Sequence, residues 1–255
     1  MERTRLPRLE VVLKPVTSEE DIPALAEIND LALENDAIKI WMKMFTERNE
    51  YESTTKSVKE ALSNPSYKIV KAIVPDPNNP DKEKIVGFSH WLEGYIVLDK
   101  VDPFAKQTEP ALKEAEDVKD VASNIAENLE VKAQRSVSEE DVDRAARLRI
   151  GEARYVTTRN YYIASIRGKK HMFIRRLMTL PEYQGRGVAS KMLKLITDEA
   201  DKQKIACWLN SRPAGEPLYR KVGFKVIAET DLSEPKYNLK VPPSCAMLRL
   251  PQPVE

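Results

Sequence analysis

The sequence is poor in the residues that build disulfide frameworks and metal centres. Its 255 residues include two cysteines, Cys207 and Cys245, and two histidines, His90 and His171. Two cysteines are too few for a disulfide framework, and their separation does not match the spacing of a zinc site. We therefore expect buried free thiols and no bound metal.

Long apolar runs and an excess of one charge are also missing. No stretch approaches the ~18 apolar residues of a membrane span, and residues 1–5 lack the apolar segment of a secretory signal. The 41 Lys and Arg residues nearly balance 40 Asp and Glu, giving a net charge of +1, whereas nucleic-acid binders usually carry a basic excess. The sequence predicts a cytoplasmic protein that binds neither membranes nor nucleic acid.

Residue patterns in the N-terminal part predict a strand, several helices and a hairpin. Ser18 and Asp21 form a capping signal before an apolar pattern of helical spacing, and the Pro- and Asn-rich stretch 75–81 cannot be crossed by a helix. The expected elements are a strand over 9–15, helices over 22–31, 37–46 and 53–63, and paired strands over 67–74 and 85–92.

The middle of the chain, residues 93–170, is dominated by charged residues and alanine. A second capping signal at 138–141 predicts a helix that continues to about Arg149. Two interpretations stay open: a solvated helical insertion, which charge runs usually indicate, or a lid over a substrate pocket.

The C-terminal part is the most regular. We expect strands over 171–180, 205–209, 224–228 and 246–250, with helices from Val188 to Ala200 and from Glu216 to Gly223. Between the first strand and the first helix lie Gly185 and Gly187 in Gln-Gly-Arg-Gly-Val-Ala. Such a loop offers backbone N–H groups and a helix N-terminus to an anion, which predicts a pyrophosphate site. The loop lacks the Gly-Lys-Ser/Thr ending of a Walker motif and the third glycine of a dinucleotide fingerprint.

Two segments resemble the signatures of the GNAT N-acetyltransferase superfamily. Residues 184–189 match its acetyl-CoA motif, Gln/Arg-x-x-Gly-x-Gly/Ala, and residues 218–224, Leu-Tyr-Arg-Lys-Val-Gly-Phe, resemble its second signature. The close resemblance covers roughly 173–228, and the layout is similar to that of fungal small-molecule members.

The resemblance implies an α/β (α+β) GNAT fold, a mostly antiparallel, centrally splayed sheet flanked by helices. Residues 1–255 would form a single domain, with 93–170 as a helical insertion after the third strand. It implies an N-acetyltransferase that uses acetyl-CoA as cosubstrate and acetylates the amine of a small molecule by direct attack in a ternary complex, as a monomer or homodimer. The alternatives are acetylation of a protein or peptide amine, or a non-catalytic acyl-CoA-binding module.

The resemblance also implies which residues hold the cosubstrate. Backbone groups of the strand before the loop would bind the pantetheine arm in a gap between strands, with the Thr179 N–H polarising the thioester carbonyl. Loop N–H groups would hold the pyrophosphate, Arg186 and Lys191 could add charge, and Asn210 could reach the pantetheine amides. The expected cosubstrate-binding residues are Leu177, Met178, Thr179, Gln184, Gly185, Arg186, Gly187, Val188, Ala189 and Asn210.

For catalysis, Tyr219 matches the tyrosine that family members use as general acid toward the CoA sulfur. Protein-lysine members carry a glutamate as general base where this chain has Phe173. The base would therefore lie elsewhere, with His90 and Glu93 as candidates because a histidine of pKa about 6.5 suits the task, or a water chain would replace it. The aromatic residues Trp41, Phe45, Tyr161 and Tyr162 could line the substrate pocket or pack in the core.

Overall fold

We describe the fold from a computed structural model of the chain, which describes residues 6–36, 39, 49–95, 162, 164–166, 168–231, 233 and 243–253. Most of the predicted insertion, the predicted helix over 37–46 and the residues Trp41, Phe45 and Tyr161 lie outside these residues. Among the described residues, no helix is both long and apolar enough to span a membrane.

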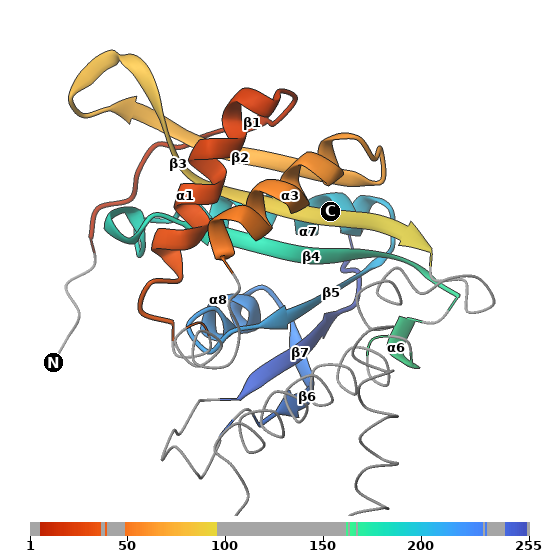
Figure 1. Ribbon diagram of the computed structural model, residues 1–255. Coiled ribbons are helices and arrows are strands. Elements are labelled where there is room, and N and C mark those ends of the chain that lie inside the picture. The colour runs from red at the N-terminus through yellow and green to blue at the C-terminus, as the bar shows by residue number, and fades with distance from the viewer. Residues whose placement is uncertain are drawn as a thin grey trace, which may run out of the picture.

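Seven strands form one sheet in the order β1-β2-β3-β4-β5-β7-β6. All neighbouring pairs are antiparallel except β4 and β5, which run parallel. Helices α1 and α3 cover one face, and α7 covers the other (Figure 1). The predicted α/β architecture is confirmed. In chain order the elements are β1 (Val12–Pro15), η1 (Glu19–Asp21), α1 (Ile22–Ala32), α3 (Glu50–Leu62), β2 (Tyr67–Asp76), β3 (Asn79–Tyr95), α6 (Ala164–Ile166), β4 (Lys170–Thr179), η3 (Pro181–Tyr183), α7 (Val188–Lys202), β5 (Ala206–Ser211), α8 (Glu216–Lys221), β6 (Lys225–Thr230) and β7 (Ser244–Arg249).

The hairpin and the first cap differ from the sequence prediction in their limits. Strands β2 and β3 continue to a turn at residues 77–78, where the Asp76 carboxylate accepts a hydrogen bond from the Asn78 N–H. Ser18 does act as a cap, because its hydroxyl accepts from the Glu20 N–H. Asp21 does not reciprocate: its carboxylate binds the Lys71 ammonium at 2.7 Å, a partner 50 residues away.

Helix α7 packs across the centre of the sheet because its apolar residues recur at helical spacing. Its buried residues are Val188, Met192, Leu193, Ile196, Thr197 and Ala200. They join the core formed with β3, β4 and β5. Gly87 of β3 is needed here, because a Cβ atom at this position would lie 2.7 Å from the Met178 carbonyl oxygen. The two cysteines are buried free thiols, as predicted.

Candidate active site

Strands β4 and β5 pair only at their N-terminal ends. The parallel register runs from His171 opposite Ala206 to Ile174 opposite Leu209 and then stops. Strand β4 nevertheless continues to Thr179, and β5 continues to Ser211 while paired with β7. The two strands diverge towards their C-terminal ends (Figure 1). Among the described residues, no strand pairs with this edge of β4 beyond Ile174.

The backbone of this edge offers hydrogen-bonding groups. The Leu180 N–H donates to the Val86 carbonyl on the β3 side. Because N–H groups alternate along a strand, the Met178 N–H also points to β3, and those of Leu177 and Thr179 point to the open side. This corrects the expectation for Met178, whose backbone groups serve the β3–β4 ladder. Leu177 and Thr179 remain candidates.

The glycine loop lies between this open edge and the N-terminus of α7. Gly185 and Gly187 have φ values of +73° and +93°, which side chains with a Cβ atom rarely adopt. No described residue accepts a hydrogen bond from the N–H groups of Gly185 to Ala189. With the positive end of the α7 dipole, these groups form a site suited to a phosphate.

The side chains of Gln184, Val188 and Ala189 lie in three different environments. Gln184 Nε2 donates to the Thr179 carbonyl at 3.1 Å, so this side chain ties the loop to the end of β4. Val188 is buried in the core, and only its backbone faces the loop. Ala189 is half-buried in the first turn of α7, where a larger side chain would lie beside the N–H groups.

The N-terminal segment also lies against the loop, a contact that no pattern in the sequence predicts. The Leu9 N–H donates to the Arg186 carbonyl at 3.1 Å, and the Arg186 guanidinium donates to the Pro7 carbonyl at 3.4 Å. The Lys191 ammonium donates to the Val11 carbonyl. Arg186 and Lys191, expected to add charge to the site, thus also hold this segment in place. The segment brings Arg8 beside Gly187: a Cβ on that glycine would lie 3.9 Å from Arg8 Cγ.

Tyr219 lies on α8, which begins beyond the open end of β5 (Figure 1). Its ring is buried and packs against Phe224 at a centroid distance of 5.7 Å. Its hydroxyl makes no recorded hydrogen bond with any described residue. Burial raises the pKa of the phenol well above its usual value. Tyr219 therefore stays protonated at neutral pH, and full proton transfer to a thiolate would be more uphill than for an exposed tyrosine.

The two candidate bases lie on opposite faces of the sheet. His90 is fully buried on the α1–α3 side, and burial, together with Arg175 and Arg176, lowers its pKa to about 3. Glu93 lies on the α7 side and binds Lys170 at 2.7 Å. Burial raises the pKa of Glu93, but hydrogen bonds from Lys170 and Gln203 outweigh that effect and hold it below its usual value. The structure does not bring these residues together, and it leaves both weakly basic.

The remaining candidates are aromatic or exposed. Phe173 packs against the rings of Tyr162 and Trp208, so the family's base position is filled by an apolar cluster. Tyr162, a candidate for the pocket wall, is buried in this cluster and hydrogen-bonds His171. Asn210 is exposed on β5 where the strands have diverged. The described residues include no group of three or more His, Cys, Asp or Glu side chains that could hold a metal.

Comparison with known proteins agrees with this geometry. A family profile described as an acetyltransferase (GNAT) domain matches residues 139–226. Residues 139–226 are therefore similar to a GNAT acetyltransferase domain. The matched profile supports an acyltransferase that uses acetyl-CoA as its acyl donor. No curated protein matches the sequence at a significant level.

Solved structures show the same fold at low sequence identity. Arylalkylamine N-acetyltransferase 2 from Aedes aegypti has a TM-score of 0.57 at 12% identity, covering 96% of this chain and 100% of that one. Mosquito arylalkylamine N-acetyltransferase like 5b has a TM-score of 0.54 at 13% identity, covering 94% of this chain and 100% of that one. A Corynebacterium glutamicum protein described as histone acetyltransferase HPA2 and related acetyltransferase has a TM-score of 0.50 at 15% identity. The match covers 96% of this chain and 98% of that one. At these identities the likeness supports a shared fold and nothing about the activity of this chain.

Proposed function

We propose that this protein transfers the acetyl group of acetyl-CoA to the amine of a small molecule by direct attack in a ternary complex. The observation that carries the proposal is the end of β4–β5 pairing at Ile174 and Leu209. The gap offers backbone N–H groups of β4 to an extended, amide-containing arm, and it leads to the glycine loop. An arm that ends in a diphosphate matches both features.

The cosubstrate would be held mainly by backbone groups. The N–H groups of Leu177 and Thr179 face the gap, and that of Thr179 would polarise the thioester carbonyl. The N–H groups of Gly185 to Ala189 would bind the diphosphate. Arg8, Arg186 and Lys191 would add positive charge near it, and Asn210 lies on the opposite side of the gap.

Acetyl transfer requires a neutral amine, attack on the thioester carbon, and protonation of the sulfur. In the proposed reaction a C–N bond forms, the C–S bond breaks, and the amine releases one proton while the thiolate gains one. Tyr219 would donate a hydrogen bond to the sulfur as negative charge develops there. Its raised pKa favours such a donor role over complete proton transfer.

The amine would lose its proton to a water chain rather than to His90 or Glu93. A histidine with a pKa of about 3 holds few protons at neutral pH, and Glu93 is engaged by Lys170 on the other face. The aromatic cluster around Phe173 also supports a small-molecule acceptor, because it replaces the base that protein-lysine members carry.

The proposal is tested by calorimetry with acetyl-CoA and by a thiol-release screen over small amines and peptides. We expect micromolar affinity and turnover with at least one small amine. Tight binding without turnover of any acceptor would instead identify an acyl-CoA-binding module. Turnover restricted to peptides would establish the protein-acetylating alternative, and absence of acetyl-CoA binding would reject the assignment of the gap and loop.

A further inference from the structure

A polar cluster lies on the α1–α3 face of the sheet, where β4 leaves β5. It consists of Arg175, Tyr67 and His90, and we call it the Arg175 cluster. The Arg175 guanidinium donates to the Tyr67 hydroxyl at 3.2 Å and lies 5.8 Å from the centre of its ring. The His90 ring packs against the same tyrosine at a centroid distance of 5.1 Å.

A β-bulge places Arg175 at this point. The β3–β4 register passes from His90 opposite Arg176 to Trp91 opposite Ile174, so Arg175 is an extra residue on β4. Bulges of this kind redirect a side chain and are common next to active sites. Ile174 is the last residue of β4 that pairs with β5. Arg175 is therefore the first residue of the open stretch that the proposed reaction uses.

Among the residues that the structure describes, no carboxylate offsets the charge of Arg175. Other arginines bind carboxylates, as Arg249 binds Asp201 and Arg220 binds Glu216. Arg175 has no carboxylate partner among the described residues, and the neighbouring Arg176 donates to the Ser57 hydroxyl at 2.9 Å. The low pKa of His90 has burial as its main cause, but both arginines contribute to it. Arg175 thus brings a positive charge that no described carboxylate offsets.

The Arg175 cluster also has hydrogen-bonding capacity to spare. A guanidinium carries five N–H donors, and that of Arg175 makes one hydrogen bond within the described part of the chain. Both ring nitrogens of His90 are buried and have no hydrogen-bond partner among the described residues. Buried polar groups in folded proteins are nearly always partnered. The unused N–H donors of Arg175, together with the single N–H of the neutral His90 ring, therefore point to a ligand that accepts hydrogen bonds.

We propose that the Arg175 cluster is an anion subsite that binds a carboxylate of the acceptor, so that the substrate class is amines bearing a carboxylate, such as amino acids. This inference rests on the proposed function. The planar fork of the guanidinium matches the two oxygens of a carboxylate. A purely cationic acceptor such as a diamine would be repelled by the Arg175 charge. The signal in the sequence is Arg175-Arg176 between the apolar residues Ile174 and Leu177.

The test uses amino acids paired with the amines that lack their carboxylate: glycine and methylamine, histidine and histamine, tyrosine and tyramine, lysine and cadaverine. For wild type we expect kcat/KM at least 50-fold higher for the carboxylate-bearing member of an accepted pair. Arg175→Met, which keeps the apolar packing on Tyr67, should raise KM for that member about 100-fold and leave the other unchanged. Arg175→Lys should restore part of the loss.

The matched control is Lys68→Met, which removes an exposed cation from the strand that carries Tyr67. It should leave the preference unchanged. Equal use of both members by wild type, or a preference that survives in Arg175→Met, would overturn the proposal.

A binding measurement separates this inference from the proposed reaction. Calorimetry in the presence of CoA compares N-acetylglycine with N-methylacetamide, which lacks the carboxylate, and needs no turnover. We expect N-acetylglycine to bind at least 10-fold more tightly to wild type and to lose that advantage in Arg175→Met. If no amine is turned over but this difference is found, the proposed reaction fails and the anion subsite stands. If both compounds bind equally, the subsite is rejected whatever the turnover.

Discussion

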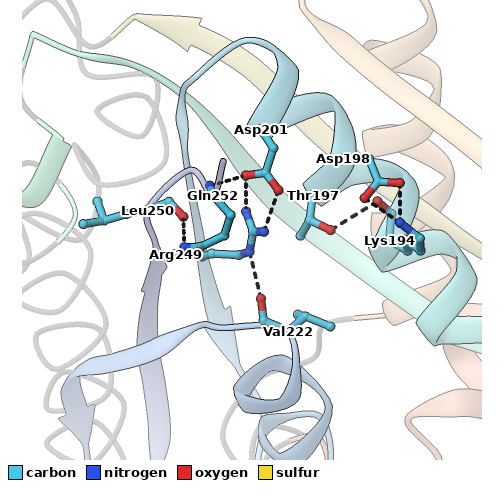
Figure 2. Close-up of polar contacts among 8 residues, drawn as sticks. All are labelled: Lys194, Thr197, Asp198, Asp201, Val222, Arg249, Leu250 and Gln252. Atoms are coloured by element: carbon cyan, nitrogen blue, oxygen red, sulfur yellow. Dashed lines mark hydrogen bonds and ion pairs between the residues drawn. The ribbon is translucent and has the colours of Figure 1, made fainter. Parts of the chain in front are cut away.

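The two ends of helix α7 differ in how their polar groups are used. At the C-terminal end, Asp201 binds the Arg249 guanidinium through two contacts of 2.7 Å and also accepts from the Gln252 N–H (Figure 2). Arg249 in turn donates to the Val222 carbonyl at 2.8 Å. At the N-terminal end, the loop N–H groups have no acceptor among the described residues. Partnered groups at one end join α7, β7 and the end of α8, whereas unpartnered groups at the other end remain available to a ligand.

The largest effect should come from breaking the partnered end. Arg249 and Asp201 have side-chain exposures of only 6% and 12%. Arg249→Met would leave Asp201 as a poorly compensated charge, and we expect the free energy of unfolding to fall by about 3 to 5 kcal/mol. Urea titration measures this loss. Lys194→Met is the matched control: its pair with Asp198 is exposed, so it should cost less than about 1 kcal/mol. Equal losses would show that the buried pair has no special role.

His90 extends the comparison to an unpartnered group in the core. Because its pKa is lowered to about 3, the unfolded chain binds a proton at higher pH than the folded chain does. The contribution of neutral His90 to the free energy of unfolding is therefore fully present above about pH 6.5 and is lost as the pH falls toward 3. At pH 4 the loss should reach about 3 kcal/mol. Urea titrations of wild type and His90→Phe at pH 7 and pH 4 should differ in their pH dependence by this amount. Parallel pH dependences would contradict the assigned pKa.

The unpartnered end of α7 is tested without disturbing the fold. Ala189→Glu places a carboxylate beside the free N–H groups, where the helix dipole favours it. We expect an unchanged or slightly higher melting temperature and a loss of acetyl-CoA affinity of about 100-fold, because the carboxylate competes with the diphosphate. Ala189→Gln has nearly the same volume and no charge, so calorimetry should show a change of less than about 5-fold. Equal affinities for wild type and Ala189→Glu would refute the phosphate site.

A smaller effect is expected from the unpartnered hydroxyl of Tyr219. Tyr219→Phe removes a donor that makes no recorded hydrogen bond within the described structure, so stability and acetyl-CoA affinity should be unchanged. If the hydroxyl stabilises the developing thiolate, kcat should fall about 30- to 100-fold. Steady-state kinetics together with thermal melting distinguish this outcome from a packing role, in which the melting temperature falls and kcat does not.

Much of the fold could be predicted because it follows from local patterns. The spacing of Val188, Met192 and Ile196 predicts α7, and the order of strands and helices after residue 170 agrees with the structure. The limits of the hairpin were less predictable, since ladder pairing extends β2 and β3 beyond their apolar runs. The partner of Asp21 was missed because Lys71 lies 50 residues away in the sequence.

The candidate site was predicted only in part. The glycine loop and Tyr219 are recognisable from adjacent residues, and their placement is compatible with the roles proposed for them. The direction of the Met178 backbone, the opposite faces of His90 and Glu93, and the cluster that fills the Phe173 position depend on pairing between strands. Arg8 and Arg175 gained their proposed roles only from the contacts of a distant segment and from a bulge in the register.

The sequence alone determined where helices and strands form and where glycines permit a tight loop, because these depend on the spacing of side chains along one segment. The tertiary structure decided which polar groups have partners. Arg249 and Asp201 share one buried ion pair, whereas Arg175, His90 and the loop N–H groups keep unused hydrogen-bonding capacity. Partnering and pKa depend on burial and on charges brought together from distant segments, and the spacing along the chain does not contain that information.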